Sequence, residues 1–362
     1  MSDIYLFGAG IQGQIFLRAM KANGVEPAAI IDSFSTKTNV DGVSVIRPEE
    51  VTDKGAKIYI SVGLMSRKIK KQLESDGFIN VFDFTQSLTA FPNIIVELKL
   101  HSLWYSENLS DRVDEAAIAG FNKLLCDDIS RDLLAKIVRF RTEFLIEDYI
   151  SPDEQLQYFT DDVPALSHLE SVRFIDAGAY NGDTLKSLFK VAKAKQLPVE
   201  YCASFEPDPA NLLGLNTACS ELVNTGNNAR VFVYPSGVWS ESAQLSFEAD
   251  SNTSSKLSLG SINASTINCV ALDDVVYGAR PNFIKMDVEG AEKQALSGAS
   301  KTIADFSPVL AICLYHNPKD LWQIPELIMQ INPNYDMYLR VYGDMLLETV
   351  LYCIPKKILS KQ

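Results

Sequence analysis

The sequence predicts an α/β protein with two parallel-sheet domains, the second a larger doubly wound sheet, joined by a helical connector. Short apolar runs alternate with helical patterns over residues 1–87 and again over 171–362, as strands do when helices cover their sheet. In both segments the first apolar run ends in a glycine-rich loop, "FGAGIQG" and "DAGAYNG". Over residues 88–170 the strand pattern fades, which separates the two domains.

In the first domain, residues 1–87, a smaller parallel α/β domain of nucleotide-binding type is expected. Its strands are expected in the buried apolar runs 4–10, 28–33, 57–63 and 79–84, and its helices at Ile11–Ala22 and Ser66–Ser75. Such a strand–helix alternation requires a parallel sheet with both faces covered.

The segment 88–170 is expected to be helical. Ile129, Leu133 and Ile137 recur at helical spacing, and Ser130 is placed to cap that helix. The stretch "SPDEQLQYF" (151–159) predicts a polar turn followed by aromatic anchors.

The last domain, residues 171–362, is predicted to hold a seven-stranded sheet that ends in an antiparallel pair. The sheet strands are expected in the runs 171–178, 201–207, 230–239, 281–290, 308–316, 335–343 and 346–355. A hairpin is expected from 243–249 and 267–275, and helices over 184–194, 209–221, 291–300 and after Pro318.

Composition narrows the class of protein. With 362 residues, 47% hydrophobic and 22% charged, the chain can bury two cores. A formal net charge of −13 without a dense basic block argues against a nucleic-acid partner. No apolar run reaches the roughly 20 residues of a membrane helix, and no charged-then-apolar leader opens the chain. The six cysteines show no CxxC, and Cys202, Cys269, Cys313 and Cys353 fit buried strands, so a reducing, cytoplasmic location is predicted.

The loop after residue 175 has the spacing D-x-G-x-x-x-G, and it lacks the Lys-Ser/Thr pair of a phosphate-binding loop. Strand ends beside a helix N-terminus favour an anionic ligand group, and S-adenosylmethionine offers a carboxylate without a phosphate. Asp176 could bind its ammonium group, although a strand-end acid that only caps the next helix is the alternative. The predicted cofactor-binding residues of this loop are Asp176, Gly178, Ala179, Gly182, Asp183 and Thr184.

Two further strand ends complete the predicted cofactor site. Glu206, with Pro207, follows the next strand, where its two carboxylate oxygens could accept the ribose hydroxyls, as acids also do in NAD sites. Gly237 and Val238 would flank the adenine. Trp239 either joins them or belongs to the core.

These blocks resemble the FkbM family of S-adenosylmethionine-dependent methyltransferases. The matching stretches are "FIDAGAYNGDTL", "FEPDPANL", "GVW", "LDDV", "FIKMDVEGAEKQALSGA", "PVLAICLYHNPKDLWQIPELI" and "ETVLYCIP", in family order over about residues 150–355. The resemblance implies a class I methyltransferase (Rossmann-like) sheet and methyl transfer, usually to a hydroxyl of a sugar or natural product.

Methyl transfer to a hydroxyl is helped by a base, and three side chains at neighbouring strand ends are candidates. His316 is predicted to be the base, with Asp287 or Glu289 orienting it or the acceptor, and Asp287 also bordering the cofactor. Alternatively His316 only bonds the loop. Together with Glu292, these residues could instead hold magnesium or manganese, but the sequence does not show that they converge, and no metal ligand is assigned.

Three more residues near these strand ends have less defined roles. Lys285 is expected to pair with a carboxylate. Asn317 and Lys319 are candidates for the acceptor pocket.

The first glycine-rich loop places Gly8, Gly10 and Gly13 between a strand and a helix, with Asp32 at the end of the next strand. This meets the formal pattern of a dinucleotide site, although about 87 residues give only half of a dinucleotide fold. The segment resembles the N-terminal domain of bacterial sugar acyltransferases, through "FGAG" and "IID". A nucleotide or nucleotide-sugar site, an empty structural domain and an NAD site all stay open.

The leading hypothesis is an O-methyltransferase that acts on a glycan or small metabolite. The alternatives are a cofactor-binding module or scaffold in bacterial glycan biosynthesis, and an NAD-linked oxidoreductase through the first domain. The acceptor, N- as against O-methylation and the oligomeric state stay open.

Overall fold

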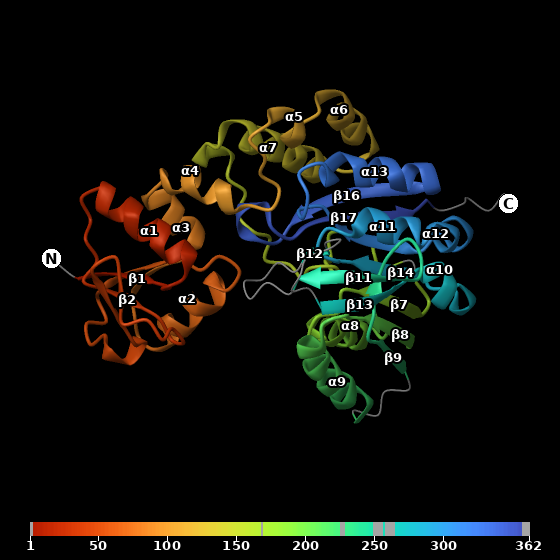
Figure 1. Ribbon diagram of the computed structural model, residues 1–362, viewed down its shortest axis with the longest axis horizontal. Helices are drawn as coiled ribbons and strands as arrows, with labels where there is room; N and C mark the ends of the chain where they lie inside the picture. The colour runs from red at the N-terminus through yellow and green to blue at the C-terminus, as the bar shows by residue number, and fades with distance from the viewer. Residues whose placement is uncertain (1–2, 168, 225–228, 249–255, 258–264, 357–362) are drawn as a thin grey trace. The chain divides into compact units, whose positions relative to one another are not determined.

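The computed structural model describes residues 3–167, 169–224, 229–248, 256–257 and 265–356 (Figure 1). The chain divides into two compact units. The first unit consists of Met1–Arg112, Ala135–Asp153 and Val341–Glu348, and the second of Val113–Leu134, Glu154–Arg340 and Thr349–Gln362. Three chain segments therefore form each unit, and the predicted boundaries at residues 87 and 170 stay a prediction.

The first unit contains a six-stranded sheet in the order β3-β4-β2-β1-β5-β6. Four strand pairs are parallel: β4·β2, β2·β1, β1·β5 and β5·β6. The edge strand β3 pairs antiparallel with β4. The strands are β1 Ile4–Phe7, β2 Ala29–Ile31, β3 Asn39–Val40, β4 Val43–Ile46, β5 Lys57–Ile60 and β6 Asn80–Phe82. The predicted parallel α/β unit is confirmed. The short β3–β4 hairpin was not predicted from the sequence.

Helices α1 Ile11–Ala22 and α2 Ser66–Ser75 begin and end where the apolar periodicity predicts. The first unit also contains α3 Phe84–Ala90, α4 Ile94–Leu98 and α5 Leu109–Arg112, with the 3₁₀ turns η1 Pro48–Glu50, η2 Lys99–His101 and η3 Ile146–Asp148. None of the helices in the described residues is long and apolar enough to span a lipid bilayer.

The distant segment 341–348 is bonded into the first unit. Trp104, which is fully buried, donates its indole N–H to the Met345 carbonyl at 2.7 Å. The Tyr149 hydroxyl donates to Asp344. The Arg67 guanidinium donates to the backbone carbonyls of Pro152 and Asp153. Side chains and backbone groups from all three segments thus complete this unit.

The second unit contains the predicted seven-stranded sheet, in the order β16-β17-β15-β14-β7-β8-β9. Strands β9, β8, β7, β14 and β15 are parallel, and β17 runs antiparallel to β15. The strands are β7 Val172–Ala177, β8 Val199–Phe205, β9 Arg230–Tyr234, β14 Phe283–Met286, β15 Val309–Cys313, β16 Tyr335–Val341 and β17 Thr349–Pro355. The parallel strands therefore end at one edge, where the candidate residues lie.

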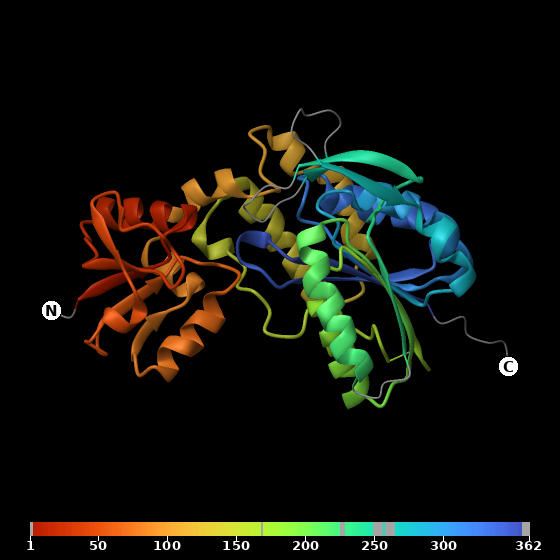
Figure 2. The same cartoon turned by 60° about the horizontal axis from the view of Figure 1, so that its bottom comes forward.

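Helices cover this sheet, as Figures 1 and 2 show, with α8 and α9 beside β7–β9 and with α11, α12 and α13 beside β14–β17. The helices of the second unit include α6 Glu115–Leu124, α8 Asp183–Ala194, α9 Pro209–Asn224, α10 Leu272–Val275, α11 Glu292–Ser297, α12 Ser300–Phe306 and α13 Asp320–Ile331, with the turn η4 Tyr277–Ala279. The single helix predicted over 291–300 is wrong. The helix breaks at Gly298, where an added Cβ would lie 2.0 Å from the Trp239 carbonyl oxygen.

A small second sheet has the order β10-β13-β11-β12, with β10 Gly237–Val238, β11 Ala243–Glu248, β12 Lys256–Leu257 and β13 Ser265–Val270. The antiparallel pairing of β11 with β13 confirms the predicted hairpin, whose Ala249 lies outside the described residues. The four cysteines assigned to strands are buried, as predicted. Phe159 is the predicted aromatic anchor, since its ring packs on Phe174 and Phe283.

The helix α7 Asp128–Glu143 corrects the predicted cap. Asp127, not Ser130, caps it, because the Asp127 carboxylate accepts from the Ser130 backbone N–H at 2.8 Å. Ser130 is instead buried, and its hydroxyl oxygen accepts from the Leu339 backbone N–H at 2.8 Å. Helical periodicity could not distinguish these two neighbouring cap residues.

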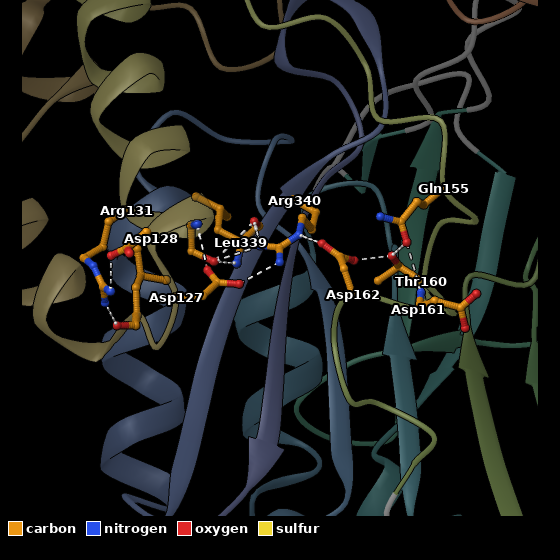
Figure 3. A network of polar contacts seen from close by, with 11 residues as sticks. Asp127, Asp128, Arg131, Gln155, Thr160, Asp161, Asp162, Leu339 and Arg340 are labelled. Carbon is orange, nitrogen blue, oxygen red and sulfur yellow. Dashed lines mark hydrogen bonds and ion pairs between the residues drawn. The ribbon is translucent and has the colours of Figure 1, made fainter.

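Arg340 of β16 is the centre of a buried polar network that joins three segments of the second unit (Figure 3). Its guanidinium is 1% exposed and donates to Asp127 at 2.7 Å, to Asp162 at 2.6 Å and to the Ser130 hydroxyl at 3.0 Å. Beyond Asp162 the network continues to Thr160 and Gln155. One cation thus holds the start of α7 and the 155–162 segment against the sheet.

We expect Arg340→Met to lower the free energy of unfolding by at least about 2 kcal/mol, because two carboxylates lose their shared partner in a poorly hydrated site. Urea unfolding followed by circular dichroism measures this. Arg131→Met is the matched control, since the Arg131–Asp128 pair is exposed and should change the free energy of unfolding far less. Equal effects of the two substitutions would contradict the assigned role of Arg340.

Candidate functional site

The glycine-rich loop after β7 is held tightly by the protein itself. Gly178 and Ala179 both donate their backbone N–H to the Phe205 carbonyl at 3.0 Å. Gly178 has φ +80°, and an added Cβ would lie 1.8 Å from the Asp287 carbonyl oxygen. Gly182 has φ +83°, and an added Cβ there would lie 2.7 Å from the Ala218 methyl carbon. Both residues must be glycine for backbone conformation and for close packing, as the sequence indicated.

Glu206 connects this loop to the end of β8. Its side chain is buried, with one carboxylate oxygen accepting from the Tyr180 N–H at 2.9 Å. The other oxygen accepts from the Asp208 N–H at 2.9 Å and from the Asn211 amide at 3.3 Å. Burial raises the pKa of Glu206, while these donors oppose the rise. The oxygen bonded to Tyr180 can accept a further hydrogen bond.

Asp176 ends β7 as predicted, but its carboxylate is fully buried and meets a cation of the chain itself. The Lys285 ammonium group of β14 lies 3.3 Å from it, so the expected pairing of Lys285 is confirmed. Lys285 also donates to the Gly178 carbonyl. Burial raises the pKa of Asp176 to about 6, although Lys285 opposes the rise. Burial alone would lower the pKa of Lys285, but Asp176 and Asp287 raise it, so the ammonium stays charged.

Asp287, directly after β14, is held by two tyrosines. The Tyr158 hydroxyl donates to one carboxylate oxygen at 2.9 Å and the Tyr315 hydroxyl to the other at 3.2 Å. Burial would raise the pKa of Asp287, but Lys285 and His316 lower it below its ordinary value. Sequence reasoning missed both tyrosines. Tyr315 adjoins His316 in "LYH", whereas Tyr158 lies 129 residues from Asp287 and gives no local signal.

His316, directly after Leu314 and Tyr315 beyond β15, lies among three carboxylates. Its Nδ1 is 2.9 Å from Glu292, and its Nε2 is 3.4 Å from Glu289 and 3.5 Å from Asp287. These are ion-pair distances, and neither ring nitrogen makes an in-line hydrogen bond among the described residues. Burial would lower the pKa of His316, but the carboxylates, Glu292 first, raise it well above 6.5. The carboxylates therefore favour the protonated ring over the free base that the sequence predicts.

The turn between β14 and α11 presents the remaining acids. Glu289 has a left-handed backbone, φ +54°, and its side chain is 42% exposed. Glu292 is fully buried, and one of its oxygens accepts from the Val288 backbone N–H at 2.9 Å. An added Cβ on Gly290, φ +93°, would lie 3.2 Å from the Asn317 amide nitrogen. The turn thus exposes Glu289 and buries Glu292.

Other predicted residues surround this edge with less defined geometry. Val238 is buried, and Gly237 packs on Cys269, where an added Cβ would lie 2.9 Å from the sulfur. Trp239 is partly buried against Ile267 and Cys269, which favours a packing role. The rest lie at the loop and strand ends: Ala179 and Thr184 buried, Asp183 and Lys319 exposed, and Pro207 and Asn317 partly exposed.

The glycine-rich loop of the first unit is bonded to a side chain of the same unit, that of Asp32. Gly8 has φ +111°, and an added Cβ on Gly13 would lie 1.9 Å from the Gly8 carbonyl oxygen. Asp32 accepts from the Ala9 N–H at 2.9 Å and from the N–H groups of Phe34 and Ser35. Burial would raise the pKa of Asp32, but these donors lower it. A ribose would compete with three backbone donors for this carboxylate. Around Gly10 the space is open.

Comparison with known protein families gives a match in the second half of the chain. Residues 176–345 match the family model of the methyltransferase FkbM domain. The chain carries a methyltransferase FkbM domain. The matched residues include the strand ends of the second unit from Asp176 to His316, and the match is the one that the motif order predicted.

The fold of the whole chain is also found in a solved structure. The methyltransferase FkbM from Methylobacillus flagellatus KT matches with a TM-score of 0.61 at 23% identity, over 98% of this chain and 90% of that one. A match to the small RNA methyltransferase HEN1 has a TM-score of 0.31 at 13% identity, over 59% of this chain and 28% of that one, too low to carry an argument. No curated protein matches the sequence significantly.

We expect Lys285→Met in the FkbM domain to lower the free energy of unfolding by about 3–5 kcal/mol, because Asp176 would stay fully buried without its cation. The double variant Lys285→Met/Asp176→Leu should recover part of this loss, since no buried charge remains. Urea unfolding of the single and double variants measures both effects.

Lys186→Met is the control for this test, because the Lys186–Glu221 pair lies on the surface and should contribute less than about 1 kcal/mol. A Lys285→Met protein as stable as wild type would show that the buried pair is not needed for the fold.

Proposed function

We propose that the protein is an S-adenosylmethionine-dependent O-methyltransferase that acts on a hydroxyl of a sugar, glycan or small metabolite. The observation that carries the proposal is the juxtaposition, within an FkbM domain, of a glycine-rich loop, Glu206 on the adjacent strand end and an acidic cluster on the next strand ends. A donor site and an acceptor site would thus share one edge of the sheet, where ligands bind in open α/β folds.

The residues after β7 and β8 fit the donor in chemical terms. Backbone N–H groups at the start of α8 suit a carboxylate, because the helix N-terminus carries partial positive charge. The Glu206 oxygen that bonds Tyr180 keeps a lone pair for a ribose hydroxyl. Asp176 has no exposed surface, so we assign it to Lys285 and the loop and not to the donor's ammonium group.

S-adenosylmethionine supplies an electrophilic methyl group, and the protein must orient an acceptor oxygen toward it. Glu289 is the most exposed of the three carboxylates around His316, and we assign it the role of accepting the hydroxyl proton. His316 is buried behind these carboxylates, so it acts as a positioning residue that holds Glu289 and Asp287 by charge. Tyr158 and Tyr315 fix Asp287 and thus the wall of the acceptor site.

Transfer of a labelled methyl group from S-adenosylmethionine to a panel of sugars, glycans and small hydroxylated metabolites tests the function. Label in an ether linkage would support the proposal. Label on a nitrogen atom would show that the protein is an N-methyltransferase instead. Donor binding without transfer to any acceptor would favour the alternative of a binding module.

We expect Glu206→Gln to weaken S-adenosylmethionine binding by at least about tenfold, because a charge-assisted hydrogen bond to the ribose becomes a neutral one. Isothermal titration calorimetry measures the affinity. Glu221→Gln, an exposed acid on the neighbouring helix α9, should bind the donor as wild type does. Equal affinity for wild type and Glu206→Gln would argue against the donor site.

We expect Glu289→Gln to lower kcat by about 100-fold or more, because the amide cannot accept the hydroxyl proton. Donor affinity should stay within about twofold, since Glu289 is assigned to the acceptor. Steady-state kinetics with an acceptor found in the panel, together with donor titration, separates the two effects. An unchanged kcat would remove Glu289 from the mechanism.

A further inference from the structure

We propose that Asp287, Glu292 and His316 form a binding site for one divalent cation, magnesium or manganese, at the carboxyl ends of β14 and β15. The donor site described above does not require a cation, so this inference goes beyond the proposed function.

The three side chains converge although they come from three different elements. Asp287 follows β14, Glu292 begins α11 and His316 follows β15. One carboxylate oxygen of each acid and one ring nitrogen of His316 lie within 4.8 Å of one another. Ligands about 2.1 Å from a common ion lie roughly 3–4.2 Å apart, so a small closure of the side chains would bring them into coordination.

Buried acceptor atoms without partners point to a missing ligand. Glu292 is fully buried, and its second carboxylate oxygen has no hydrogen-bond partner among the described residues. Both nitrogens of the buried His316 ring lie at ion-pair distances from carboxylates, but neither makes an in-line hydrogen bond among the described residues. Unpaired buried polar atoms are costly and rare in folded proteins, and an ion is one of the few things that explains them.

The charges of the cluster also favour a cation. Asp287, Glu289 and Glu292 lie within 3.5 Å of His316, so even a charged ring neutralises only one of three carboxylates. Lys285, whose charge also acts on Asp287, is paired with Asp176. The Tyr158 and Tyr315 hydroxyls that contact Asp287 are neutral. A doubly charged ion, bound to the neutral imidazole in place of the ring proton, would offset two of the three negative charges.

The donor atoms select the class of ion. Two or more carboxylates with a single imidazole form a hard, mostly oxygen site, which suits magnesium or manganese better than copper or structural zinc. Glu289, on the exposed side of the turn, leaves room for water or a hydroxyl oxygen at the ion. Such an ion would lie where the proposed function places the methyl acceptor.

Titration of the full-length protein with MnCl2 tests the site, with isothermal titration calorimetry for affinity and electron paramagnetic resonance for bound ion. Neither S-adenosylmethionine nor an acceptor is present, so the result is independent of methyl transfer. We expect one equivalent of Mn²⁺ to bind, magnesium to compete for it, and Glu292→Gln and His316→Gln to weaken binding at least tenfold.

Glu326→Gln is the matched control, since Glu326 is an exposed acid on α13 and should leave binding unchanged. Circular dichroism verifies that each variant is folded. Should the buried substitutions unfold the chain, Asp287→Asn, whose side chain is 21% exposed, takes their place with the same expectation. Failure of the wild type to bind Mn²⁺, or unchanged affinity in the folded ligand variants, would overturn the proposal.

Discussion

The buried ion pair between Asp176 and Lys285 is the constraint on which the candidate site depends. Both side chains lie inside the sheet of the second unit, on adjacent parallel strands whose registers place Asp176 opposite Lys285. Neither charge could be tolerated there alone, because desolvation of a single ion exceeds what the rest of the packing can offset. Together they fix the ends of β7 and β14 relative to each other. Lys285 then bonds Gly178, so the loop starts from a defined point.

From that point outward, the edge of the sheet is organised mainly by backbone groups. Gly178 passes so close to the Asp287 carbonyl that no side chain fits, and its N–H bonds Phe205 on the other side. Glu206 accepts two backbone N–H groups, and Glu292 accepts one. Carboxylates held in this way cannot reorient freely, and fixed polar groups are what a transfer reaction between two bound molecules requires.

The sequence predicted the fold well, and it predicted which candidate residues follow neighbouring strands, because both depend on local patterns. Strand ends that carry Asp176, Glu206, Asp287 and His316 follow apolar runs, and a parallel sheet necessarily brings such ends to one edge. What the sequence could not supply depends on distant partners. Tyr158 lies far from Asp287 in the sequence and contacts it only in the folded chain. Asp127 caps α7, whereas the Ser130 hydroxyl accepts a hydrogen bond from the Leu339 backbone N–H. The role predicted for His316 assumed an ordinary pKa, which three converging carboxylates change.

The composition of the first unit has a consequence for how this protein can be divided. Its six-stranded sheet is built from the start of the chain, yet the Trp104 indole and the Tyr149 hydroxyl bond residues of the 341–348 segment, which connects the last two strands of the other sheet. A fragment that ends after Tyr149 would keep Trp104 but lose the 341–348 segment, so the buried indole N–H would lose its acceptor. The two units are therefore interlaced along the chain, and no single cut in the sequence separates them.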